Sequence, residues 1–219
     1  MKKLNKIPSE EVYEIELQGS FIPEKFTPFW FVQNKLLGEK EAEESNIIDI
    51  TPGERSVFST KFIRFFIEND TFSVSTKEFL TFDLVKDMAI SVANLLKDSI
   101  MPSYSVNMRL HYSFDSEKDR RKVLNNLNGL DSWNNIVDSP QVYSLKIIEE
   151  KKLEKKELNR MISLFPCNRP DMKNTIHVYV TNFQELNSDK SSVSSIIEDD
   201  NDSLNESISI ANKIINLYF

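Results

Sequence analysis

The feature that most constrains the fold is an order of elements that occurs twice along the chain. In Glu11–Phe21 (EVYEIELQGSF) apolar residues alternate with acids and glutamine, which predicts a strand with one buried face. Tyr104–Phe114 (YSVNMRLHYSF) has the same pattern and begins 92 residues after Val12 (104 − 12 = 92). Each of these strands precedes a predicted helix, three strands and another helix. The chain of 219 residues therefore divides into two similar units, 1–103 and 104–219.

The elements that follow each opening strand are predicted from their periodicity. Helices are expected over 23–37, 81–100, 115–129 and 203–219, where apolar residues recur every three to four positions. Strands are expected over 46–50, 55–69, 71–78, 141–148, 157–165 and 174–183. Joined edge to edge, the two β-α-β-β-β-α units predict an α+β fold. Its curved antiparallel sheet of about eight strands has helices on one face and an open second face.

Two resemblances accompany this layout. The duplicated element order resembles the TATA-box-binding-protein-like fold, a pseudo-symmetric saddle. The run SFIPEKFTPFWF, Ser20–Phe31, is similar to a Ser-Phe, Pro, Phe, Pro, Trp-Phe run in a family of uncharacterised bacterial proteins. The family resemblance implies a bacterial protein and carries no established activity.

Composition excludes several classes of protein. The net charge of −7 disfavours a general binder of nucleic acid or anionic lipid. Four glycines, scattered along the chain, cannot form a phosphate-binding loop, and Cys167 as the only cysteine excludes an intramolecular disulfide and a cysteine-rich zinc site. No apolar stretch follows the N-terminal lysines and no run of eighteen apolar residues occurs. We expect a cytoplasmic protein with no membrane segment and no cofactor.

Three residues are candidates for metal or catalytic chemistry. His111 and His177 each lie in a predicted strand without metal-ligand spacing, which favours ordinary sheet histidines; a metal site with Asp115 or Asp171 is the alternative. Cys167 lies in a proline-flanked turn, and no base can be named beside it. A small hydrolase that uses these residues is therefore the third hypothesis for function.

Two lysine- and arginine-rich segments carry the second hypothesis, a nucleic-acid-associated subunit. One is a predicted helix and the other a predicted hairpin tip. Their basic residues are Lys118, Arg120, Arg121 and Lys122 on the helix, and Lys151, Lys152, Lys155 and Lys156 at the tip. Acids are interleaved in both segments, as is usual for a solvated surface. Nucleic acid is therefore an unlikely partner.

The first hypothesis is a non-enzymatic adaptor or accessory subunit of a bacterial multi-component system. A sheet with helices on one face leaves its other face and its edge strands available to a protein partner or to a second copy. The segment 55–69 carries apolar residues on both faces near its end, so Phe62, Phe65 and Phe66 are candidate partner-binding residues. The alternative for each phenylalanine is burial in the core.

The aromatic run Ser20–Phe31 poses the same question. In a helix over 23–37 the residues Phe26, Trp30 and Leu37 share one face and should pack on the sheet. Phe29 and Phe31 point away from that face. Exposed, they would be candidate partner-binding residues; buried, they would belong to the core.

Overall fold

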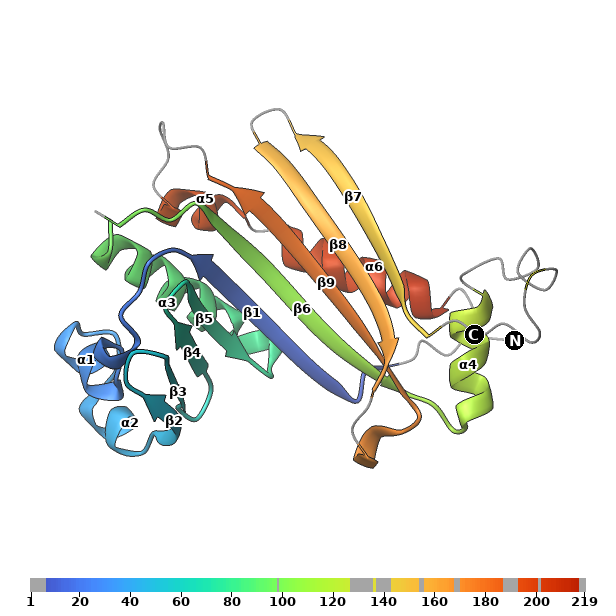
Figure 1. Ribbon diagram of the computed structural model, residues 1–219, viewed down its shortest axis with the longest axis horizontal. Coiled ribbons are helices and arrows are strands. Elements are labelled where there is room, and N and C mark those ends of the chain that lie inside the picture. The colour runs from blue at the N-terminus through green and yellow to red at the C-terminus, as the bar shows by residue number, and fades with distance from the viewer. Residues whose placement is uncertain are drawn as a thin grey trace.

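The computed structural model describes residues 7–97, 99–126, 136, 143–153, 156–167, 170–186, 193–200 and 202–216. The described part is an α+β structure built on one curved, open, nine-stranded antiparallel sheet (Figure 1). The predicted fold class is therefore confirmed. Helices lie behind the sheet in this view and leave the face toward the viewer without a helical layer over its central strands (Figure 1).

Elements of the first unit depart from the predicted order in two ways, since η1, α1 and the unpredicted α2 replace one helix and a fourth strand is present. Strand β1 is followed by the 3-10 turn η1, two short helices, four strands, the turn η2 and a long helix. Their bounds are β1 Glu10–Gln18, η1 Pro23–Lys25, α1 Pro28–Gln33, α2 Glu39–Glu43, β2 Asn46–Thr51, β3 Arg55–Ser59, β4 Arg64–Glu68, β5 Thr71–Thr76, η2 Phe79–Thr81 and α3 Phe82–Leu95.

Elements of the second unit include three strands after its first helix, as predicted, and end in two helices. Their bounds are β6 Ser103–Ser113, α4 Glu117–Asn126, β7 Leu145–Leu153, β8 Lys156–Pro166, η4 Pro170–Met172, β9 Thr175–Glu185, α5 Val193–Asp199 and α6 Ser203–Asn216. Helix α5 was not predicted, because its seven residues VSSIIED give too short a periodic pattern.

The two units meet at the middle of the sheet. The strand order is β2-β3-β4-β5-β1-β6-β9-β8-β7, so the opening strands β1 and β6 are neighbours. They pair antiparallel from Glu10 opposite His111 to Gln18 opposite Ser103. Each unit then extends outward from this central pair, with the first unit ending at edge strand β2 and the second at edge strand β7.

The prediction of one long strand over 55–69 was wrong, because the chain turns back at Thr60–Ile63. The Thr60 amide donates to the Ile63 carbonyl at 2.8 Å, and the Ile63 amide donates to the Thr60 hydroxyl at 3.4 Å. Strands β3 and β4 are the two arms of this hairpin, and Val57 lies opposite Phe66. The turn adds a fourth strand after α2 and brings the sheet to nine. Alternating apolar residues on both arms had concealed it, since the turn contains neither glycine nor proline.

The prediction of one helix over 23–37 was also wrong. The Thr27 hydroxyl accepts the Trp30 amide at 3.3 Å and caps a new helix whose first residue is Pro28. This helix, α1, ends at Gln33, and Lys35 adopts a left-handed φ of 61°. Helix α1 thus begins five residues after the predicted start at residue 23, and its buried face differs from the predicted one. Phe31 points into the core, and Phe29 points into solvent.

The core lies between the sheet and the helices. Helix α3 packs on β1 and β5, and α6 packs on β6 and β9. Phe31 has no exposed surface, and its ring lies 5.6 Å from the Phe58 ring and 4.6 Å from the Phe65 ring. Phe58 and Phe65, opposite each other on β3 and β4, are stacked at 4.6 Å. An aromatic cluster on the helix-covered face therefore attaches α1 to the first unit.

A buried polar network attaches α6 to the second unit. Arg160 on β8, only 3% exposed, donates to the Asn182 side-chain oxygen at 2.7 Å, to Glu149 at 3.1 Å and to Glu206 of α6 at 2.5 Å. The Asn182 amide donates in turn to the Ser207 hydroxyl at 2.8 Å. Because the guanidinium offers five N–H donors in a planar fork, one side chain joins β7, β8, β9 and α6.

Replacing Phe29 and Phe31 one at a time tests which of the two belongs to the core. We expect Phe31→Ala to lower the free energy of unfolding by about 3–5 kcal/mol, because it leaves a cavity between α1 and the β3–β4 hairpin. Phe29 is 63% exposed, so Phe29→Ala should change stability by less than about 0.5 kcal/mol. Urea unfolding of both variants measures the difference, and equal effects would contradict the assigned orientations.

Removal of the buried guanidinium tests the polar network. Arg160→Ala leaves the buried Asn182 oxygen without its donor, and we expect a loss of about 3 kcal/mol in unfolding free energy. Arg64→Ala, which removes an exposed arginine from β4, is the matched control and should cost less than about 0.5 kcal/mol. Similar losses in urea unfolding would show that the network around Arg160 does not hold α6.

Candidate functional site

The β3–β4 turn separates two hollows on the surface. Residues Ser59–Ile63 line both of them. One hollow, the helix-side groove, has a volume of about 890 Å³ and lies between the turn, α2 and α3. The other, the sheet-face hollow, has a volume of about 730 Å³ and lies over β1, β4 and β5 on the face opposite the helices.

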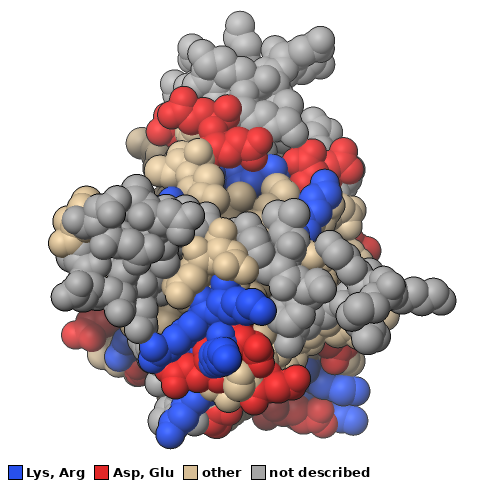
Figure 2. Space-filling model, turned by 90° about the vertical axis from the view of Figure 1, so that its right-hand side faces the viewer, with Lys and Arg blue, Asp and Glu red and all other residues tan. Residues whose placement is uncertain are grey.

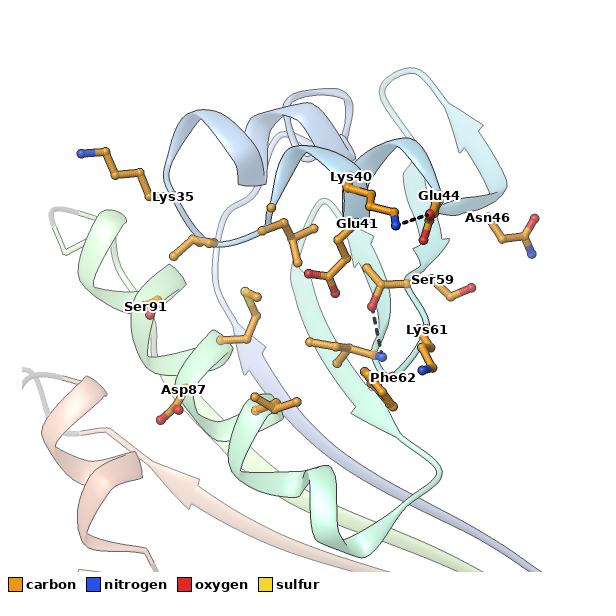
Figure 3. Close-up of a pocket in the computed structure, with 17 residues that line it drawn as sticks. Lys35, Lys40, Glu41, Glu44, Asn46, Ser59, Lys61, Phe62, Asp87 and Ser91 are labelled. Carbon is orange, nitrogen blue, oxygen red and sulfur yellow. Dashed lines mark hydrogen bonds and ion pairs between the residues drawn. The ribbon is translucent and has the colours of Figure 1, made fainter.

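Two helices form the walls of the helix-side groove (Figure 3). Helix α3 presents Leu84, Asp87, Met88 and Ser91, which recur at helical spacing along one face. On the opposite side α2 contributes Lys40 and Glu41, and Glu44 follows its last residue. The loop before α2 adds Leu36 and Leu37 to the lining.

The lining of the helix-side groove combines exposed apolar surface with two carboxylates on opposite walls. Phe62 is 41% exposed and Leu84 is 46% exposed. Glu41 points from α2 toward the space above the turn, and Asp87 comes from α3 (Figure 3). Neither carboxylate has an ion-pair partner among the described residues, whereas Lys40 pairs with Glu44 at 3.7 Å and Lys61 lies 4.7 Å from the Phe62 ring centre. The groove could therefore accept apolar side chains accompanied by cations.

The sheet-face hollow contains charged side chains that are already paired on its β1 side. Glu14 on β1 accepts from the Asn107 amide at 3.0 Å and from Arg109 at 3.3 Å, both on β6. Burial raises the pKa of the neighbouring Glu16, and the hydrogen bond from Gln18 opposes this rise. Glu14 raises the pKa of Glu16 further through its charge. The centre of this face therefore already contains matched charges.

The two histidines lie side by side on the same open face. They are directly opposite in the β6–β9 pairing, and their rings stack with centres 3.9 Å apart. Glu10 lies 3.3 Å from the Nδ1 atom of His111, and the Phe165 ring lies 4.9 Å from the His177 ring. Within the described ranges, no group of three or more His, Cys, Asp or Glu side chains is arranged to hold a metal ion. The alternative of a metal site with Asp115 or Asp171 thus gains no support.

Cys167 is a buried thiol that follows β8. It is 6% exposed, and its sulfur lies 3.9 Å from the Met172 sulfur. Its backbone amide donates to the Thr175 carbonyl at 2.9 Å. These contacts are those of a packed structural cysteine, and the hydrolase hypothesis remains without a base assigned to the thiol.

The structure divides the five candidate phenylalanines. Phe31 and Phe65 are fully buried in the core, which contradicts their prediction as partner-binding residues. The late start of α1 turns Phe31 inward, and the strand alternation of β4 turns Phe65 inward. Phe29 and Phe62 are exposed, and the half-buried Phe66 lines the sheet-face hollow. Among these five phenylalanines, Phe62 alone lines both hollows.

The basic helix is α4, and its arginines are internally paired. Glu117 accepts from Arg121 at 2.6 Å and from Arg120 at 3.3 Å, and the hydrogen bond from Arg121 lowers the pKa of the Glu117 carboxyl. Lys118 and Lys122 are exposed. At this end of the molecule, lysines and arginines lie among acids (Figure 2). These contacts reduce the basic surface that a nucleic acid would need, and the second hypothesis stays untested.

The predicted basic hairpin tip falls where β7 meets β8. Lys151 and Lys152 are residues of β7, and Lys156 begins β8. Their side chains, and the whole of Lys155, lie outside the described residues.

Several groove residues were not recognised from the sequence. The helical spacing of apolar residues over 81–100 includes Leu84, but α3 buries Val85, Met88, Ala89, Val92 and Ala93 and leaves Leu84 exposed. Glu41 and Asp87 carry no local signal, since each is one acid among many. Their proximity to the β3–β4 turn depends on the packing of α2 and α3.

Neither a comparison with protein-family models nor one with curated proteins returns a match to the chain. In the described part of the structure, no helix is both long and apolar enough to cross a lipid bilayer.

The two neighbouring glutamates of β1 should respond oppositely to neutralisation. The folded-state pKa of Glu16 is raised above its ordinary value of 4.5, so its burial penalty is absent below that pH and grows as pH rises through the raised pKa. We expect Glu16→Gln to stabilise the protein at pH 7 by about 0.5 kcal/mol, and the gain to vanish near pH 4. Glu14→Gln should destabilise at pH 7, because it weakens the contacts with Asn107 and Arg109. Urea unfolding at both pH values measures these changes, and destabilisation by Glu16→Gln at pH 7 would contradict a pKa of Glu16 that burial raises.

Proposed function

We propose that the protein is a non-enzymatic, cytoplasmic adaptor or accessory subunit that binds a partner protein in the helix-side groove. The observation that carries this proposal is the combination of exposed Phe62 and Leu84 with the carboxylates of Glu41 and Asp87 on opposite walls. Large apolar side chains in a rimmed hollow are typical of a surface that another protein covers.

The dimensions of the groove favour a helical segment of the partner. The α3 wall runs from Leu84 to Ser91, and the rise between these two residues is about 10 Å or two helical turns. An amphipathic helix that lies along this wall would place residues i, i+3 or i+4, and i+7 against Leu84, Met88 and Phe62. Their burial would remove apolar surface of both proteins from water.

The charges of the groove favour lysine or arginine on the flanks of that helix. Glu41 and Asp87 lie on opposite walls and have no ion pair among the described residues. A cation on each side of the apolar stripe would meet one of these carboxylates, which supports specificity more than affinity. The proposed partner segment is thus a short amphipathic helix with a Leu-rich face and basic flanks.

The centre of the open sheet face is a less suitable surface for such a segment. Glu14 there is already engaged by Asn107 and Arg109. A partner that covered this face would have to remove water from charges that are already paired. This desolvation costs free energy, and no new ion pair would compensate for it.

A designed peptide pair tests the proposed groove. Two fluorescein-labelled helical peptides would share leucines at i, i+3, i+4 and i+7, with lysine flanks in one and glutamate flanks in the other. We expect the lysine peptide to bind with a Kd in the range of about 10–100 μM and at least about tenfold more tightly than the glutamate peptide. Fluorescence anisotropy measures both affinities.

Groove variants locate the binding. Glu41→Lys with Asp87→Lys should reverse the preference toward the glutamate peptide, and Phe62→Ser should weaken binding of both peptides about tenfold. Phe29→Ser is the matched control, because Phe29 is equally a surface phenylalanine but does not line the groove. No binding of either peptide at about 1 mM, or no reversal by the double variant, would refute the proposed site.

A further inference from the structure

Strand β7 presents a long free edge at one end of the sheet. It is last in the strand order and pairs with β8 alone among the described strands. Its nine residues run from Leu145 to Leu153 at the margin of the sheet (Figure 1). The outward backbone N–H and C=O groups of such an edge can pair with another strand, and soluble proteins usually protect long apolar edges. Ile147 and Ile148 of this edge are nevertheless 42% and 66% exposed.

The open-face side of β7 carries a pattern that is complementary to itself. Lys146, Ile148 and Glu150 are at alternate positions and point to the same side as Met161, which lies opposite Ile148 on β8. All three are exposed, and neither Lys146 nor Glu150 has an ion-pair partner among the described residues. A lysine and a glutamate thus lie at equal distances on either side of an exposed isoleucine.

We propose that two copies of the protein associate through antiparallel pairing of their β7 strands, with the twofold axis at Ile148. Antiparallel pairing brings directly opposite residues to the same side of the combined sheet. In this register Ile148 meets its counterpart, and each Lys146 meets the Glu150 of the other copy. Two ion pairs therefore flank an apolar centre, and all outward backbone groups of the paired segment find partners. Such an isologous contact closes at a dimer.

The opposite edge of the sheet lacks this complementarity. Strand β2 also exposes two isoleucines, Ile47 and Ile48, but its single charged residue, Asp49, is paired with Arg55 at 2.5 Å. The pairing of β2 with β3 is also irregular between Ile47 and Asp49. An irregular edge with no free charge pattern opposes strand addition. The observations therefore favour β7 as the dimer edge.

The dimer is independent of the proposed groove, which lies near the other end of the sheet order. The groove is bordered by the β3–β4 turn and by Asn46, the first residue of β2. Pairing at β7 leaves both grooves of the dimer uncovered and at opposite ends of a continuous sheet. Such a dimer could hold two partner segments at once, with the gain in avidity that bivalency provides.

Charge exchange at the two flanking positions tests the register. Sedimentation equilibrium of the full chain at low salt should show a monomer–dimer equilibrium. Lys146→Glu and Glu150→Lys should each weaken dimerisation by about tenfold, because each turns two attractive pairs into two repulsive ones. The double variant Lys146→Glu/Glu150→Lys should restore the dimer to within about threefold, because it only reverses the direction of both pairs.

Mixing the two single variants is a second test of the proposed register. An equimolar mixture of Lys146→Glu and Glu150→Lys should form heterodimers, since both flanking side chains are acidic in the first variant and both are lysines in the second. Lys25→Glu, which changes an exposed lysine of η1, is the control and should leave the dimer unchanged.

Three outcomes would overturn the proposal. They are a monomeric wild type at about 500 μM, a dimer insensitive to both single reversals, and a double variant that stays monomeric while its far-UV circular dichroism matches that of the wild type. The comparison of circular dichroism spectra distinguishes a folding defect of the double variant from a lost interface. The monomeric variants should still bind the lysine peptide in the helix-side groove. This measurement tests the groove separately from the dimer.

Discussion

The pairing of β1 with β6 is the interaction on which the rest of the structure depends. These two strands open the two units, and nine residues of β1 find partners on β6. Their apolar residues, such as Ile15 opposite Val106, form the middle of the helix-covered face. Without this pairing each unit would expose a long, apolar strand edge to water. With it, the sheet becomes continuous and both units share one core.

A single row of side chains across the helix-covered face shows how the two units differ. From β3 to β1 the row contains Phe58, Phe65, Val74 and Ile15, and it continues through Val106, Asn182 and Arg160 to Glu149 on β7. The first unit binds α1 by aromatic packing, which depends on shape. The second binds α6 through the Arg160 network, which depends on direction and charge. The two ends of one sheet therefore hold their helices by different physical means.

The surface follows from this arrangement. The β3–β4 turn projects between the helical layer and the open face, so it borders a hollow on each side and exposes Phe62. At the other end, Ile147 and Ile148 of the edge strand β7 are exposed to solvent. The proposed partner groove and the proposed dimer edge thus lie toward opposite ends of the sheet, which allows both contacts in one assembly.

The amino-acid sequence alone determined the α+β class and the two strands, β1 and β6, that open the predicted units, because alternation and helical spacing are local patterns. It named Phe62, Phe65 and Phe66 together as candidate partner-binding residues, and only the structure separates the exposed Phe62 from the buried Phe65. It did not reveal the β3–β4 turn, since no glycine or proline marks it, nor the start of α1 at Pro28, which depends on the Thr27 cap. Whether Phe29 or Phe31 entered the core was therefore decided only by tertiary structure. The same holds for the walls of the groove and the Arg160 network, because their residues are distant in sequence and become neighbours only when the helices pack on the sheet.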